Sequence, residues 1–161
     1  MSAHPDKGFT LIELLITLAI LGILATMAWP MGEMAVQRSK EQELRQSLRE
    51  IRNGLDAYKQ AVEEGRIAHS LIKSGYPPSL QVLVEGVPDA HSANGKGRIF
   101  FLRHIPRDPM SAAGPDIPDE ETWGTRSYES SADQPEAGDD VFDVYSLSGA
   151  VGMNGIPYRN W

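Results

Sequence analysis

The sequence predicts an α+β fold in which one long N-terminal helix packs on a small antiparallel β-sheet. The first observation is an apolar run over residues 9–28, followed by a stripe of apolar residues at helical spacing that reaches residue 62. The second is the C-terminal part, where glycine and proline become frequent and short aromatic and β-branched segments typical of strands appear. With 161 residues, the chain has room for one small domain beyond the apolar run.

The apolar run contains one charged residue, Glu13. Twenty helical residues span about 30 Å, enough to cross the hydrocarbon core of a bilayer. A cleaved secretory signal would have a shorter apolar core and a small-residue cleavage site. Trp29 follows the run, where its amphipathic ring suits the membrane interface. We therefore predict a transmembrane helix, half of the long helix, over residues 9–29.

An amphipathic continuation of the helix is predicted over residues 30–65. Pro30 is expected to kink the helix, and Gly65 is a suitable C-cap. The apolar positions recur every three or four residues, which places them on one face. They are Leu44, Leu48, Ile51, Leu55, Tyr58 and Val62. This stripe is short for a coiled coil, so we expect it to be buried against the chain's own C-terminal domain.

Residues 66–161 are predicted to form the globular domain. A short helix is expected to begin with Ser79 as N-cap and to end at Gly86. The segments TWGTRSYES (residues 122–130) and DVFDVYSLS (residues 140–148) are typical of strands, and a connection rich in acidic residues separates them. The polar, proline-rich residues 111–121 indicate a surface loop. Residues 152–161 either add a third strand or wrap around the sheet.

Composition and motifs exclude several classes of function. The chain has no cysteine, so it has no disulfide and no thiolate site. Between Asp116 and Asp143 there are ten acidic residues and one base, Arg126, and this charge disfavours nucleic-acid binding. The histidines are scattered without a zinc-binding spacing, and no nucleophile motif or phosphate-binding loop is present. We therefore do not expect an enzyme.

The junction Gly8-Phe9-Thr10-Leu11-Ile12-Glu13 before an apolar run resembles the class III signal of type IV pilins and pseudopilins. Later segments are similar to landmarks of the pseudopilin G family of type II secretion systems. These are GYPPSLQVLVEG, RHIPRDPM with TWG and SY further on, and DVFDVYSLSG. The resemblance implies a pilin-like fold, a prepilin leader peptide over residues 1–8, cleavage between Gly8 and Phe9, and N-methylation of Phe9.

Two departures from the family pattern stand out. Residues 111–122 separate Asp108-Pro109 from Trp123-Gly124, which are contiguous in the family. The family's calcium site uses aspartates after the YSxG strand, whereas residues 147–161 contain no acid. A hard cation such as Ca²⁺ takes several oxygen ligands, usually charged ones. We therefore expect no cofactor, and the alternative calcium donors would be Asp139, Asp140 and Asp143.

The resemblance implies that Glu13 acts in assembly. An unpaired carboxylate among packed helices carries a desolvation penalty, and cleavage creates an α-amine on Phe9 that can pair with Glu13 of a neighbouring subunit. The alternatives are an acid that reaches interfacial water and an intramolecular contact between Phe9 and Glu13. The resemblance also implies that the helix loosens between Gly22 and Pro30, although both residues could act in packing alone.

The sequence therefore predicts a structural subunit of a type II secretion pseudopilus. The expected precursor is a single-pass protein of the bacterial inner membrane with its domain in the periplasm. Its expected partners are other copies of itself, minor pseudopilins, a prepilin peptidase, an inner-membrane platform protein and a secretion ATPase. The first alternative is a pilin of a type IV pilus or DNA-uptake filament. The second is a membrane-anchored periplasmic enzyme or binding domain, which would need a pocket with convergent polar groups.

Overall fold

The computed structural model describes residues 9–67, 74–93 and 96–161, without the side chains of residues 27–31. The chain divides into two compact units, one up to Ser39 and one from Lys40 to Trp161. Helix α1 (Leu11–Glu63) contributes to both. Of the predicted amphipathic continuation, residues 30–65, the part from Lys40 onward therefore folds together with the C-terminal residues. The predicted leader over residues 1–8 lies outside the described residues.

The first unit is the start of α1. Its helical assignment continues through Gly22 and Pro30 without a break. The hydroxyls of Thr17 and Thr26 donate to the carbonyl oxygens of Leu14 and Ile23, at 2.9 and 2.7 Å. Within the part of the chain that the structure describes, no helix is both long enough and apolar enough to cross a membrane. The span over residues 9–29 stays a prediction.

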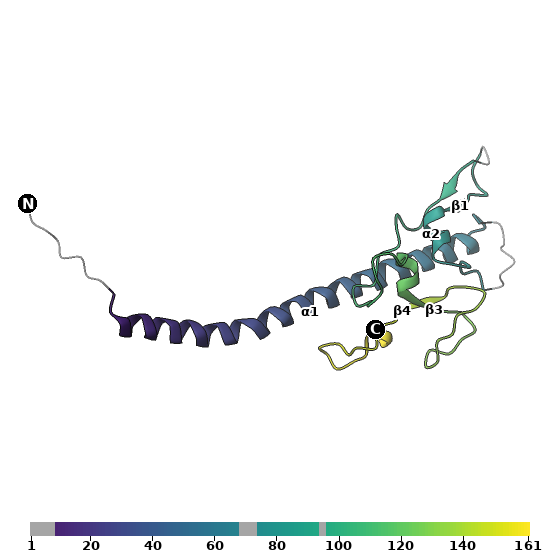
Figure 1. Cartoon of the computed structure of the whole chain (residues 1–161). Coiled ribbons are helices and arrows are strands. Elements are labelled where there is room, and N and C mark those ends of the chain that lie inside the picture. Colours follow the sequence, from purple (N-terminus) through teal and green to yellow (C-terminus); the bar gives the residue numbers. More distant parts are fainter. Residues whose placement is uncertain (1–8, 68–73, 94–95) are drawn as a thin grey trace, which may run out of the picture. The chain divides into compact units, whose positions relative to one another are not determined.

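The core of the second unit is the apolar stripe of α1. All six predicted stripe residues are buried, from 0% exposure at Leu44 and Ile51 to 7% at Val62. Residues of the C-terminal part complete the same cluster: Leu83, Trp123, Val144 and Tyr158. Figure 1 shows α2, the strands and the C-terminal segment gathered around this half of the helix. Burying each such side chain contributes about 1.5–3 kcal/mol. The prediction that the chain covers its own stripe is confirmed.

The predicted α+β fold with a small antiparallel sheet is confirmed, and the structure adds a second antiparallel pair of strands. Strand β1 (Val87–Pro88) pairs with β2 (Arg98–Ile99), and β3 (Trp123–Arg126) pairs with β4 (Asp143–Ser146). Among the described residues the two pairs share no strand. The reason is visible after β2, where the N–H groups of Phe101 and Leu102 both donate to the Leu83 carbonyl of α2, at 3.0 Å. The chain therefore turns onto a helix instead of extending the sheet.

The predicted helix ends are confirmed, but one predicted start is wrong. Gly65 follows α1 with φ of 73°, and Gly86 is the C-cap of α2 (Gln81–Glu85) with φ of 72°. Both φ angles are positive, a range that glycine adopts without strain because it has no Cβ. The N-cap of α2 is Leu80, not Ser79, and no side chain caps it. Leu80 is 3% exposed, so its burial in the core, not a hydroxyl cap, fixes where this helix begins.

The C-terminal segment wraps around the domain and adds no third strand. A single bridge joins Val151 to Pro157, and a 3-10 helix, η2, covers Tyr158–Asn160. The carboxylate of Glu41 on α1, a residue that is 8% exposed, accepts hydrogen bonds from the Met153 N–H at 2.8 Å and the Tyr158 hydroxyl at 3.0 Å. These bonds fasten the segment to the helix.

Candidate functional site

The start of α1 carries the residues that the sequence singled out for processing and assembly. Phe9 precedes the helix and is 82% exposed, whereas Gly8 lies outside the described residues. Thr10 caps the helix, because its Oγ1 accepts the Glu13 N–H at 3.3 Å. Thr-x-x-Glu is the sequence signature of a capping box, which the sequence analysis missed. A carboxylate in the first turn is also favoured by the helix dipole.

The large apolar side chains around Glu13 have no cover among the residues that the structure describes. Between residues 9 and 24 each is more than half exposed, from Ile20 at 52% to Phe9 at 82%. An added Cβ at Gly22 would meet nothing within 4 Å. A continuous apolar surface of this kind marks contact with a membrane or with other protein. The start of α1 is therefore a surface that requires an occupant.

Glu13 is the one charged side chain on this surface. The threonine hydroxyls of residues 17 and 26 are satisfied by the helix itself, so they can leave water without an unpaired donor. The Glu13 carboxylate has no hydrogen-bond or ion-pair partner among the described residues. Any assembly that covers this surface must therefore supply a partner for Glu13.

In the second unit, residues that are distant in sequence are brought together where the family pattern is interrupted. Asp108 is 1% exposed and accepts a hydrogen bond from the Ser146 hydroxyl at 2.6 Å. Its own N–H donates to Thr122 Oγ1 at 3.1 Å, and the indole of Trp123 donates to the Pro106 carbonyl at 2.7 Å. Residues 111–122 therefore form a loop, and hydrogen bonds hold its two ends close to each other.

Strand β3, which follows this loop, needs a glycine. A Cβ at Gly124 would lie 2.4 Å from the ring of Tyr145, its partner in the β3–β4 register. The Tyr145 ring thus occupies the space that a side chain would take. These contacts bring together three landmarks that are far apart in the sequence, and we call the group the structural node. It consists of Asp108, Trp123-Gly124 and Tyr145-Ser146.

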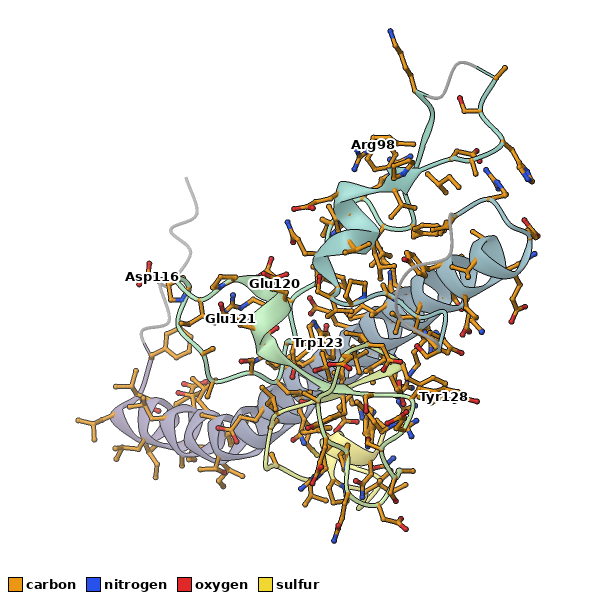
Figure 2. All side chains as sticks on the ribbon, turned by 90° about the vertical axis from the view of Figure 1, so that its right-hand side faces the viewer. Arg98, Asp116, Glu120, Glu121, Trp123 and Tyr128 are labelled. Atoms are coloured by element: carbon orange, nitrogen blue, oxygen red, sulfur yellow. The ribbon has the colours of Figure 1, made fainter. Side chains whose placement is uncertain are left out.

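One arginine, Arg107, holds the main chain of the loop over residues 111–122. The Arg107 guanidinium donates to the carbonyls of Ala113, Gly114 and Ile117, at 2.7–3.0 Å, and to the Asp119 carboxylate at 3.0 Å. The other carboxylates of this loop have no partner among the described residues. They are Asp116, Glu120 and Glu121, which Figure 2 labels on the segment that leads to Trp123. We call residues 111–122 the acidic loop.

The calcium candidates do not point at a common site. Asp143 accepts from Arg52 Nε at 2.8 Å and from an Arg126 nitrogen at 3.3 Å. Asp140 accepts from the Tyr128 N–H at 2.9 Å, and Asp139 is exposed. Within the described ranges, no three histidine, aspartate or glutamate side chains converge. Asp140 and Asp143 bind protein donors, and calcium binding at Asp139, Asp140 and Asp143 stays untested.

A cavity of about 390 Å³ lies beside the Asp143 ion pairs. Its lining contains no histidine, serine or cysteine, so it offers no nucleophile–base pair of the common kinds. The Arg52 guanidinium also donates to the main-chain oxygens of Val144, at 3.2 Å, and Trp161, at 2.9 Å. This arginine joins α1, β4 and the C-terminal segment, and its role is structural.

Comparison with known proteins agrees with the motif at the start of the chain. Residues 4–29 match the family model described as the prokaryotic N-terminal methylation motif. The chain is 28% identical over 111 residues to the type II secretion system core protein G of Klebsiella pneumoniae, covering 66% of this chain and 71% of the relative. It is 29% identical over 161 residues to the core protein G of Pseudomonas aeruginosa, covering 96% and 91%. No solved structure matches the chain.

Proposed function

We propose that this chain, which resembles two type II secretion system core proteins G, is a structural subunit of a type II secretion pseudopilus. The observation that carries the proposal is Glu13, a carboxylate without a described partner within an exposed apolar helix surface and inside the methylation motif. The precursor would be cut between Gly8 and Phe9 and methylated at the Phe9 amine. The chain itself would catalyse no reaction.

Assembly would cover the apolar start of α1 with the same segment of neighbouring copies. Removing water from Glu13 without a partner is costly, and the amine that cleavage creates on Phe9 supplies a cation. Losing one partner of a buried ion pair costs about 3–5 kcal/mol. A subunit therefore fits stably only at the axial offset that brings its Glu13 to the Phe9 amine of a neighbour. The pair would set the register of the filament.

The proposed partners follow from this role. A prepilin peptidase would remove residues 1–8, and residues 9–29 would hold the precursor as a single span in the inner membrane with the domain in the periplasm. Minor pseudopilins, an inner-membrane platform protein and a secretion ATPase would act on the subunit during assembly. These partners are inferred from the likeness to the core proteins G and from the methylation motif.

The first test is the mass of the protein extracted from membranes. We expect the mature chain to begin at Phe9, with one added methyl group. A mature chain that begins near Trp29 would instead indicate ordinary secretion and would contradict the proposal.

The second test separates pairing from capping at Glu13. A capping box accepts glutamine as well as glutamate, whereas an ion pair requires the charge. We therefore expect Glu13→Gln and Glu13→Leu both to insert and to be cleaved, and both to lose sheared filaments and secretion. Thr26→Val is the matched control, because its hydroxyl bonds only its own helix. Normal filaments from Glu13→Gln would show that the cap, not the charge, is what assembly needs.

A further inference from the structure

We infer that a groove between α1 and the C-terminal segment binds the acidic loop of a second copy of this chain. The inference rests on the proposed function, since it names one contact between neighbouring subunits. The groove has a volume of about 270 Å³, and we call it the arginine groove. It is lined by Arg45, Leu48, Arg49, Arg52, Asn154, Ile156, Asn160 and Trp161.

The arginine groove combines unpaired positive charge with apolar surface. The Arg45 guanidinium carbon lies 4.3 Å from the centre of the Trp161 ring, a cation–π contact that keeps this cation at the groove. Arg49 in the groove and Arg159 beside it have no hydrogen bond or ion pair with any residue that the structure describes. Ile156 is 47% exposed. This chemistry fits an acidic segment that carries an apolar side chain.

The acidic loop has that composition. Ile117 is 39% exposed and stands among the carboxylates without described partners, those of Asp116, Glu120 and Glu121. Arg107 already fixes the main chain of the loop, so docking would order few additional groups. Guanidinium and carboxylate groups form short, charge-assisted and often bidentate hydrogen bonds. The loop and the groove are thus complementary in charge and in apolar content.

We assign the groove to a second copy of the same chain because the charges of the groove and of the acidic loop are opposite. The acidic loop carries four carboxylates and no base, so two acidic loops repel each other, whereas a loop and a groove attract. The loop and the groove are different patches, so their contact is head-to-tail. A head-to-tail contact that does not close into a ring repeats as an open helical filament.

Cysteine crosslinking tests the contact directly, because the chain has no cysteine of its own. The probe is a short bismaleimide applied to cells that produce the full-length chain. We expect the Ile117→Cys/Ile156→Cys double variant to give a ladder of dimers, trimers and larger species. A mixture of the two single variants should give dimers that neither variant gives alone. Phe100→Cys with Ile156→Cys is the control, since Phe100 is 62% exposed and lies outside both patches.

Charge reversal tests the chemistry of the contact. We expect Arg45→Glu with Arg49→Glu to abolish the ladder, and Glu120→Arg with Glu121→Arg to restore it in the same chain. Arg103→Glu is the matched control, because Arg103 is exposed, is not in the groove lining and has no described partner. A ladder that survives reversal in the groove would overturn the inference.

Filaments, scored separately by electron microscopy, separate this inference from the proposed function. Filaments without a ladder would overturn the inference and leave the proposed function standing. A ladder without filaments would support the contact and count against the proposed function, and the absence of both would refute both. A crosslink within one chain would overturn the contact between copies. Retention of the chain on phosphatidylglycerol vesicles that depends on the arginine groove, without a ladder, would also overturn the contact between copies. That result would identify the groove as a lipid-binding site.

Discussion

Replacing Asp108 with alanine should destabilise the globular domain by about 2–4 kcal/mol. The residue is 1% exposed and accepts hydrogen bonds from the Ser146 hydroxyl at 2.6 Å and the Met110 N–H at 2.8 Å. A hydrogen bond to a charged acceptor contributes about 1.5–3 kcal/mol. Ser146 is fully buried, so its hydroxyl would lose its acceptor, whereas Met110 is half-buried and its N–H can reach water. The first bond therefore accounts for most of the expected loss.

The assay is urea unfolding of the chain from Glu33 onward, followed by the fluorescence of the buried Trp123. With a slope of about 1–3 kcal/mol per molar urea, the midpoint should fall by roughly 1–2 M. Asp116→Ala, an exposed acid without a described partner, is the control and should change stability by less than about 0.5 kcal/mol. In the double-mutant cycle with Ser146→Ala, the two losses should not add. A loss below about 1 kcal/mol, or an additive cycle, would refute the structural node.

Four further predictions follow from the second unit. The chain from Glu33 onward should fold and should form no stable dimer through the stripe of α1 in sedimentation experiments, since that stripe is covered internally; stable dimers through the stripe would contradict this. Leu55→Ala should cost about 2–5 kcal/mol by urea unfolding because Leu55 is 1% exposed, whereas the exposed Asn53→Ala should be near neutral. The hydrogen bond from Arg66 lowers the pKa of Asp89, so this carboxylate stabilises the fold above about pH 4 and loses that effect as the pH falls below it. Asp89→Asn should remove this part of the pH dependence of the unfolding midpoint, and an unchanged profile would argue against the ion pair. A chelator should leave the melting temperature unchanged, whereas a large shift on adding calcium would show that the acidic residues bind it.

Local patterns in the sequence determined the helix and the positions of its ends. Leu44 and Leu48 recur at helical spacing, and that period by itself defines a face that folding must bury. Gly65 and Gly86 end helices because a positive φ is easily reached by glycine itself, whatever the rest of the fold. The Gly-Phe junction with Glu13 is likewise a short contiguous motif, and the family model detects it. Each of these features is encoded within a few neighbouring residues.

Only the tertiary structure decided which distant residues meet. Glu41 pairs with the C-terminal segment 112 and 117 residues further along the chain, and Asp108 meets Ser146 across 38 residues. Arg52 likewise binds Asp143, one of the acids that the sequence had offered as a calcium donor. No spacing in the sequence encodes such pairs, because they depend on where the loops return the chain to the helix. The core brings these polar groups together, and each one buried there must find a partner among those the fold places beside it.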